Sequence, residues 1–449
     1  PSSSTSLQSA DTKVTLLPES VSIGDKVWID VDEDGLQNDA AVSALPSVRF
    51  TLRPYASGAE QQAKYTESGA DGLYAFSGLA PAAPGAGGAD YEDGDVIESS
   101  LLGLARTTYR LSVDVPEGYI VTGRYAENGG SVPVVGSENR TSDNNFDQNG
   151  QSELFYIPAL TNGAPTNDTS YDLGLIRMRD LRIHKVGSNG AAIEGVEFKI
   201  YGPYYREADL GTSKLFATLD PTDSNGDTEF DSRADQYLNA YAYYLIVEQD
   251  LESEYYTGLE SVSSVASGSS ASKWEGQEKN AFVLEPYNGP NASGKVQDSV
   301  TVTNTYESAG KLELSGSKQI NGAPWTGTEG EYTFQLASED DPAYADRPVT
   351  VPVDADGNFK FTLHYTFEQH VKGRQSTTYT YTLSEVAGTA NGVTYDDTVY
   401  TISVSLADDG AGAITPTATI AGSLWAMFTA SIGTVALVGG LEGWFVRKS

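Results

Sequence analysis

Residues 181–201 read LRIHKVGSNGAAIEGVEFKIY. Two runs with apolar residues at alternate positions flank the turn signal Asn189-Gly190, a pattern typical of two β-strands joined by a tight turn. The same alternation returns in short runs along the chain, for example at 48–52 and 400–404, whereas long helical patterns are scarce. The sequence therefore predicts an all-β protein.

The length and the turn signals predict three β-sandwich domains. The chain has 449 residues, and domains average roughly 150 residues. Turn dipeptides such as Asp71-Gly72 and Asn225-Gly226 divide the strands at the spacing expected of sandwiches. We therefore expect tandem immunoglobulin-like or transthyretin-like β-sandwiches. The boundaries that we assign are a leader or linker at 1–20, sandwiches at 21–177, 178–308 and 309–420, and a C-terminal segment at 421–449.

The composition excludes several classes of protein. Asp and Glu total 62 against 28 Lys and Arg, which gives a formal net charge of −34. This balance leaves no basic face to neutralise phosphates, so we expect no nucleic-acid partner. The chain has no Cys, which removes disulfides and thiolate chemistry, and with only three His a zinc site or a Ser-His-Asp triad would need an unusual assembly. These counts favour an acidic, non-enzymatic protein.

An apolar stretch near the C-terminus predicts a membrane-spanning helix. Residues 424–446 read LWAMFTASIGTVALVGGLEGWFV, with Glu442 as the single charge, and Arg447-Lys448 follow. The stretch exceeds the about 20 residues that a helix needs to cross a bilayer. The alternative is a buried core helix, but the glycines of this stretch would weaken such a helix in water. We expect a transmembrane helix with its basic tail on the cytoplasmic side.

The sequence SIGDKVWIDVDEDG near the N-terminus contains alternating acidic residues. Asp30, Asp32 and Asp34 stand two positions apart, and Gly35 permits a sharp turn. Three such carboxylates can direct their oxygen atoms at a hard cation such as Ca²⁺. The twelfth position of the loop, where a bidentate acid would complete the pattern, is Ala41. The alternative is an acidic hairpin turn exposed to solvent.

Two charged residues lie inside otherwise apolar strands of the second sandwich. Lys185 stands between Ile183 and Val186, and Glu248 ends the run YYLIVE. Burying either charge in a sandwich is unfavourable unless the charge is paired. The simplest interpretation is a satisfied Lys–Glu pair, or a Lys whose ammonium group reaches solvent.

A chemical interpretation adds Asn304, which lies in the last strand of the sandwich, SVTVTNTY. Burial favours a neutral amine, which is a nucleophile, and a neutral carboxylic acid, which is a proton donor. A Lys amine within reach of the carboxamide can then form an amide and release ammonia while Glu248 polarises the carbonyl group. Such a reaction would join the first and last strands of the sandwich by an intramolecular amide, an isopeptide bond.

The third sandwich repeats part of this set. Lys318 lies in a first strand, and Glu385 ends the run TYTYTLSE. No Asn follows Asn391, and the closing strand of Asn-Thr-Tyr type is missing. Asp408 and Asp409 are alternative partners for the lysine, but they lie in an expected turn. We expect this sandwich either to borrow a strand or to have lost one.

The motifs GDKVW at 24–28, DGLYAF at 71–76 and SDNNFD at 142–147 occur in this order in the first sandwich. Together they resemble the B repeats of serine-aspartate-repeat surface proteins of Gram-positive bacteria, over about 21–177. Such repeats bind Ca²⁺ in acidic loops and act as rigid spacers. The resemblance implies a structural Ca²⁺ site with the ligands Asp30, Asp32, Asp34, Asp143 and Asn145.

The second sandwich, over about 179–307, resembles the Cna-B type domains of Gram-positive adhesins and pilins. The resemblance lies in their bond-forming set: a Lys in the first strand, the Glu of YYLIVE and the Asn of TNTY. The resemblance implies Lys185 and Asn304 as the crosslinked pair and Glu248 as the catalytic group. The third sandwich, over about 311–415, resembles the streptococcal pilin isopeptide-linkage (FctA-like) domain, with Lys318 and Glu385 as the matching residues.

These patterns predict a cell-surface stalk, adhesin or pilin-like structural protein of a Gram-positive bacterium, and not an enzyme. We expect it on the extracellular face of the envelope, with the membrane, pilus subunits and a ligand on a host or neighbouring cell as partners. Sortase attachment is unsupported, because the chain has no LPxTG motif. The alternatives are a surface carbohydrate-active enzyme with paired carboxylates and a ligand-binding adhesive tip.

Overall fold

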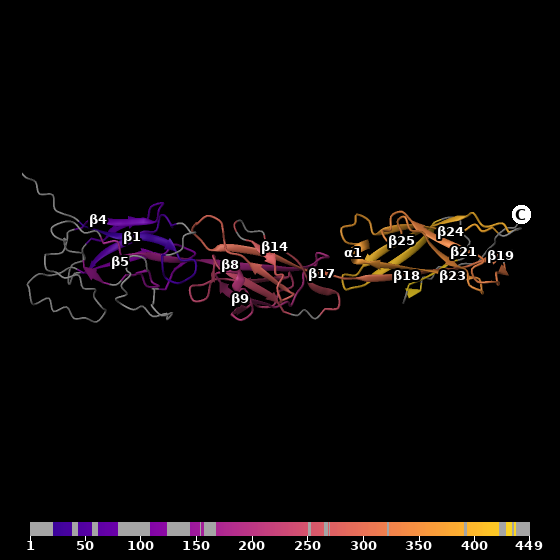
Figure 1. Ribbon diagram of the computed structural model, residues 1–449, viewed down its shortest axis with the longest axis horizontal. Helices are drawn as coiled ribbons and strands as arrows, with labels where there is room; N and C mark the ends of the chain where they lie inside the picture. Colours follow the sequence, from indigo (N-terminus) through magenta and orange to yellow (C-terminus); the bar gives the residue numbers. More distant parts are fainter. Residues whose placement is uncertain are drawn as a thin grey trace, which may run out of the picture.

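The protein is an elongated row of three β-sandwich modules (Figure 1). The structure is a computed structural model, and it describes residues 21–37, 44–55, 62–79, 108–123, 144–152, 154–156, 168–249, 253–264, 268, 270–320, 323–389, 393–421, 428–432 and 435–436. The all-β prediction is confirmed, because strands dominate these residues and the one α-helix among them, α1 (Phe367–His370), has a single turn.

The first module has two sheets around an aromatic core. Phe50 stacks on Tyr74 with ring centroids 3.7 Å apart, and it also contacts Phe146. One sheet contains β1 (Val21–Ile29), β4 (Leu73–Leu79), β6 (Tyr119–Val121) and the first residues of β8 (Leu173–Gly187). The other contains β3 (Lys64–Glu67), β2 (Arg49–Tyr55), β5 (Thr108–Asp114) and β7 (Phe155–Tyr156).

The second module is a sandwich built on the remainder of β8. In its first sheet β8 pairs with β17 (Val296–Tyr306), β11 (Asp227–Phe230) and β12 (Leu238–Asn239), and β14 (Tyr256–Ser264) pairs with β17. The second sheet has the order β10 (Leu215–Thr218), β9 (Phe198–Tyr204), β13 (Tyr243–Glu248), β16 (Ala281–Leu284) and β15 (Ala271–Lys273). The two sheets enclose a buried apolar core that includes Ile183, Phe198 and Val302.

The third module repeats this plan. Its first sheet has the order β23 (Asn358–Thr366), β18 (Ala309–Ser317), β27 (Phe428–Ile432) and β28 (Val435–Ala436). Its second sheet has the order β22 (Val349–Pro352), β21 (Thr333–Ser338), β24 (Thr378–Glu385), β25 (Val399–Asp408) and β26 (Ile414–Ala421), and a short hairpin joins β19 (Gln319–Ile320) to β20 (Ala323–Pro324). Alternate residues of β23 and β24 are buried, as the alternating sequence predicts.

The modules follow one another without linkers. Strand β8 has 15 residues and belongs to both of the first two modules, since it pairs with β1 at Leu173–Leu175 and with β17 from Arg179 onward. Only Glu307 and Ser308 separate β17 from β18. At this second joint the hydroxyl group of Tyr306 donates to Asp408 Oδ1 at 2.7 Å and its ring packs edge-on against Phe367.

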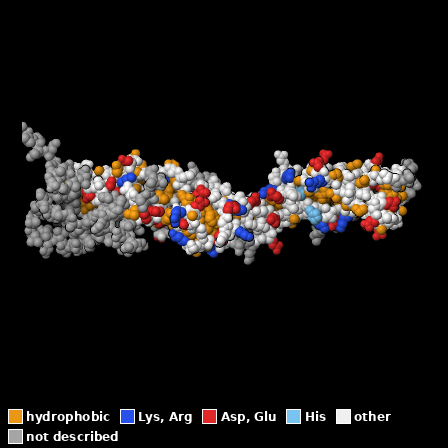
Figure 2. All heavy atoms as spheres, in the orientation of Figure 1, with side chains coloured by type: hydrophobic (Ala, Val, Ile, Leu, Met, Phe, Trp, Pro, Cys, Tyr) orange, Lys and Arg blue, Asp and Glu red, His pale blue; other side chains and the backbone are white. Residues whose placement is uncertain are grey.

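Charged side chains are distributed along the rod. Figure 2 shows acidic side chains interspersed with basic ones over the visible face of the second and third modules, without one large patch of a single sign. Mixed charges of this kind help to keep a protein surface solvated.

The prediction of a transmembrane helix over 424–446 is not met in the residues that the structure describes. None of the described helices is long and apolar enough to cross a membrane. Residues 428–432 and 435–436 of this stretch form the strands β27 and β28, which corrects the helix prediction for them. A short apolar run satisfies its backbone equally well in a helix or beside a free sheet edge, and here β18 provides the edge.

Candidate functional site

The structure brings Lys185, Glu248 and Asn304 together in the core of the second module. Their exposed fractions are 0%, 3% and 2%. The amine of Lys185 lies 3.5 Å from Glu248 Oε2, and the carboxamide Nδ2 of Asn304 donates to Glu248 Oε1 at 2.6 Å. Glu248 therefore stands between the amine and the carboxamide and contacts both.

Strand pairing fixes these positions. Strands β8 and β17 run parallel, with Lys185 opposite Val302 and Asn304 opposite Gly187, so the lysine and the asparagine lie on neighbouring strands. Glu248 ends β13 in the facing sheet. The three side chains consequently meet between the two layers, where packing leaves them few alternative conformations.

Burial changes the protonation of the pair. It lowers the pKa of Lys185 to about 8, against the opposing effect of the Glu248 carboxylate. Burial likewise raises the pKa of Glu248, although Lys185 and the hydrogen bond from Asn304 oppose this shift. Both displacements favour the neutral amine and the neutral acid, which are the forms that amide formation needs.

The carboxamide oxygen of Asn304 is available to accept a hydrogen bond. In the present orientation Oδ1 is buried and accepts no hydrogen bond from the described residues. A half-turn of the amide group exchanges Oδ1 and Nδ2, which have nearly the same shape. It would place the carbonyl oxygen where a protonated Glu248 can donate to it, and this would polarise the carbonyl group.

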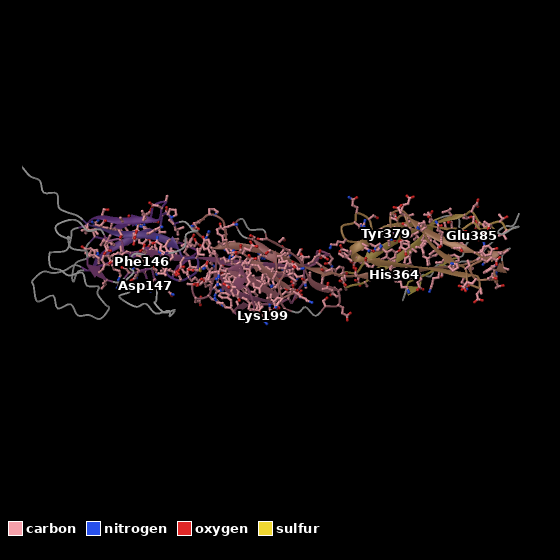
Figure 3. All side chains as sticks on the ribbon, in the orientation of Figure 1. Phe146, Asp147, Lys199, His364, Tyr379 and Glu385 are labelled. Atoms are coloured by element: carbon pink, nitrogen blue, oxygen red, sulfur yellow. The ribbon has the colours of Figure 1, made fainter. Side chains whose placement is uncertain are left out.

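In the third module Lys318 and Glu385 form a buried ion pair. The amine of Lys318 donates to both carboxylate oxygens of Glu385, at 2.8 and 2.7 Å, and lies 4.7 Å from the ring centroid of Tyr332. The backbone N–H of Asp396 donates to the same carboxylate at 3.0 Å. Figure 3 labels Glu385 toward the C-terminal end of this module. Within the described residues no carboxamide hydrogen-bonds to this pair.

The acidic loop of the first module gathers three carboxylates. One oxygen atom from each of Asp30, Asp32 and Asp34 lies within 4.8 Å of the others. Asp30 is fully buried, and its Oδ2 accepts the N–H of Gly35 and the hydroxyl proton of Thr122. Burial, followed by the neighbouring Asp34 carboxylate, raises the pKa of Asp32.

The structure describes only one of the other two expected Ca²⁺ ligands. Asp143 lies outside the described residues. Asn145 is described, and its carboxamide oxygen accepts the N–H of Asp172 at 2.8 Å. Its neighbour Asn144 donates its backbone N–H to the carbonyl oxygen of Gly35 at 3.2 Å, so this segment contacts the acidic loop.

One residue of the acidic loop was missed by sequence reasoning. The Glu33 side chain accepts hydrogen bonds from Asn239 Nδ2 at 3.0 Å and from the Tyr237 hydroxyl group at 3.4 Å, both in the second module. Glu33 has a left-handed backbone conformation, with φ 61°. The contact joins residues 206 positions apart, and no local pattern in the sequence indicates it.

Comparison with known families identifies two of the modules. Residues 314–431 match the model of the Spy0128-like isopeptide containing domain, the FctA family, and residues 21–84 match the SdrD B-like domain. These two matches agree with the resemblance to pilin and surface-adhesin domains that the sequence indicates. Both families are structural, which supports the prediction that the chain is not an enzyme. No curated protein matches the chain.

Several solved structures are similar to the chain at low identity. The Bacillus anthracis TIE protein is 14% identical, with a TM-score of 0.22, over 85% of this chain and 48% of its own. A streptococcal ancillary pilin is 12% identical, with a TM-score of 0.19, over 89% of this chain and 98% of its own. The shaft pilin SpaA of Lactobacillus rhamnosus GG is 11% identical, with a TM-score of 0.18, over 64% and 97%. The chain spans about half the length of the TIE protein.

Proposed function

We propose that the chain is a load-bearing surface stalk or pilin-like subunit whose second module locks itself with an isopeptide bond between Lys185 and Asn304. The observation that carries this proposal is the buried arrangement in which Glu248 contacts both the amine and the carboxamide. The pilin-type and adhesin-type domains on either side support a structural role at the surface of a Gram-positive cell.

The reaction needs only the three side chains. A protonated Glu248 donates to the carbonyl oxygen of Asn304 while the neutral amine of Lys185 attacks the carboxamide carbon. The new C–N bond forms, the bond to the carboxamide nitrogen breaks, and Glu248 passes a proton from the amine to the leaving nitrogen. One ammonia departs, and the chain has reacted once with itself.

The position of the bond suits a stalk. Lys185 lies in the strand that enters the second module from the first, and Asn304 lies in the strand that leaves it toward the third. A pulling force would therefore pass through the covalent bond and bypass the rest of the module. The endpoints are 119 positions apart (304 − 185), and a disulfide closing such a loop would stabilise by about 4–5 kcal/mol in the chain-entropy treatment.

We also propose that the first module binds Ca²⁺ through Asp30, Asp32 and Asp34. The residues fit this ion, because their three carboxylates converge and Ca²⁺ prefers oxygen ligands. Asn145 and Asp143 are the further candidate ligands. Bound Ca²⁺ would neutralise the repulsion among the carboxylates and so stiffen the loop. A ligand on a host or neighbouring cell, and pilus subunits, remain the proposed partners.

Intact mass spectrometry of the full chain tests the crosslink. We expect the wild-type mass to fall one ammonia below the sequence mass, and peptide mapping to find a branched peptide that joins Lys185 to Asn304. The variant Glu248→Gln should have the full sequence mass. Glu385→Gln is the matched control, because it changes the equivalent residue of the third module and should keep the deficit. A full mass in the wild-type protein would refute the proposal.

A further inference from the structure

The pairing of β17 with β8 ends at the asparagine of the proposed crosslink. The two strands pair in parallel from Val296 opposite Arg179 to Asn304 opposite Gly187, so Asn304 belongs to the last pair of this ladder. The end of a ladder opens more readily than its middle, because it has neighbours on one side only. The carboxamide that must meet the amine of Lys185 therefore lies where the pairing of β17 with β8 is least secure.

Ser188 continues this pairing beyond the last residue of β8. Its backbone N–H donates to the carbonyl oxygen of Asn304 at 2.8 Å, and its hydroxyl oxygen Oγ accepts the backbone N–H of Tyr306 at 3.0 Å. In a parallel ladder a residue donates to one residue of its partner strand and accepts from the residue two positions further on. Ser188 reproduces this pattern with its hydroxyl oxygen in place of its carbonyl oxygen, and so holds the main chain on both sides of the residue that follows Asn304.

The serine and the lysine belong to one fixed segment of the chain. They are three residues apart, and the backbone of the lysine is hydrogen-bonded on both sides. The N–H of Lys185 donates to the carbonyl oxygen of Gly226 at 2.7 Å, and its carbonyl oxygen accepts the N–H of Ile193 at 3.0 Å. Ser188 therefore links the backbone of the lysine to that of the asparagine.

The turn that contains Ser188 is closely packed. A Cβ atom added to Gly187 would lie 2.3 Å from the ring of Tyr256, and the same ring packs against Tyr306 with a centroid distance of 5.5 Å. The residues beside the two hydrogen bonds of Ser188 thus have little room to shift. This packing makes the two bonds effective in fixing the position of Asn304.

The position of the asparagine matters more for the reaction than for the fold. A single neutral hydrogen bond makes a small net contribution to stability, because the unfolded chain bonds to water instead. Amide formation requires the amine and the carboxamide carbon in a near-attack arrangement, and a misplacement of about 1 Å can slow such a step by about 100-fold. Loss of the serine hydroxyl group should therefore slow the crosslink while leaving the module folded.

We propose that Ser188 is a positioning residue for the isopeptide bond: through its N–H and its hydroxyl group it fixes the main chain around Asn304, so that the carboxamide reaches the amine of Lys185. It acts through the backbone and takes no part in the proton transfers, which remain with Glu248. The inference rests on the crosslink proposed for the second module.

Synthesis of the full chain in a cell-free system tests this role, because the crosslink then forms during the observation. Aliquots are stopped with acid, and peptide mapping gives the fraction of chains that contain the branched peptide joining Lys185 to Asn304. In Ser188→Ala we expect the branched peptide to form about 10- to 100-fold more slowly than in the wild-type chain. Ser188→Thr keeps a hydroxyl group at the same position and should restore most of the rate.

Ser232→Ala is the matched control. Ser232 is 1% exposed, and its Oγ accepts the N–H of Leu238 at 2.9 Å and donates to the carbonyl oxygen of Arg179, at the opposite end of the same ladder. Ser188 is less deeply buried. In an Asn304→Ala background, which has no crosslink, Ser232→Ala should therefore lower the denaturant midpoint of the module at least as much as Ser188→Ala. Its crosslinking rate should nevertheless equal that of the wild-type chain.

Equal rates in the wild-type chain and in Ser188→Ala would overturn the inference. Equal slowing in Ser232→Ala would also overturn it, because lost stability would then explain the effect, and so would a Ser188→Thr chain as slow as Ser188→Ala. These outcomes leave the crosslink itself in place, since the branched peptide still forms. Absence of the branched peptide from the wild-type chain would instead refute the crosslink, and the positioning role with it.

Discussion

The second and third modules contain the same buried Lys–Glu pair but differ in what the pair faces. In the second module Glu248 contacts the carboxamide of Asn304, whereas in the third module both oxygens of Glu385 accept from Lys318 itself. The lysine–carboxylate distances follow this difference, at 3.5 Å and 2.7 Å. In the described part of the third module no carboxamide contacts the pair, which forms a close ion pair.

The difference indicates that the last strand of a module decides whether a carboxamide lies beside the Lys–Glu pair. The lysine and the glutamate of the set come from strands that any such sandwich needs. Only the asparagine comes from the closing strand. Variants of these residues should either increase the difference in stability and chemistry between the two modules or remove it.

The largest effect is expected from Asn304→Ala. This variant keeps the Lys185–Glu248 pair but cannot form the crosslink, so the second module should lose about 4–5 kcal/mol of unfolding free energy. Denaturant unfolding of the wild-type and variant chains measures the loss. A change below about 1 kcal/mol, the usual size of a lost hydrogen bond, would mean that the wild-type chain has no crosslink.

The next largest effect is expected in the third module. Glu385→Ala leaves the ammonium group of Lys318 buried without its counter-ion, and breaking such a pair typically lowers stability by about 3–5 kcal/mol. The double variant with Lys318→Met should recover most of this loss, because no charge then remains buried. Differential scanning calorimetry measures both variants. Equal loss in the single and double variants would contradict the ion-pair assignment.

A pH titration should distinguish a crosslinked lysine from a free one. Burial lowers the pKa of the free Lys185 amine from 10.5 to about 8. Asn304→Ala keeps this amine free, so between these pH values the unfolded variant should bind more protons than the folded variant. Stability of the second module should therefore rise from pH 8 to pH 10.5, by up to about 3 kcal/mol.

In the wild-type chain the proposed crosslink would place the same nitrogen in an amide, which does not titrate. The difference between the two pH–stability curves thus isolates Lys185 from the tyrosines, which both chains share. Parallel curves over this range would show that the lysine is in the same state in both.

The smallest effect concerns the first module. Ca²⁺ at about 100 times its dissociation constant should stabilise this module by about 2.7 kcal/mol, while the other two modules stay unchanged. Asp32→Asn should reduce the stabilisation. Because burial and the Asp34 carboxylate raise the pKa of Asp32, Ca²⁺ affinity should fall as the pH drops through the acidic range. Calorimetry with Ca²⁺ or with a chelator measures these changes.

The places of Lys185 and Glu248 in the candidate set were predictable from the sequence because each charge conflicts with its surroundings. Lys185 and Glu248 are charged residues in apolar strands, and the fold brings the first strand β8, the strand β13 of the facing sheet and the last strand β17 together. Glu33 gave no such signal, since an acid in an acidic loop conflicts with nothing. The stretch at 428–432 was predicted as helix because apolar length alone does not distinguish a helix from a strand that completes a sheet.

The shared strand β8 has a consequence for the order in which the rod can fold. The first module is synthesised before the second, but its strand β1 pairs with β8. Val27 therefore cannot pair until Leu173 has been synthesised. Contacts this distant in sequence form slowly. The N-terminal sandwich therefore cannot complete its sheet until the beginning of the second module has been synthesised. During synthesis and export the folding of the two modules is coupled rather than sequential.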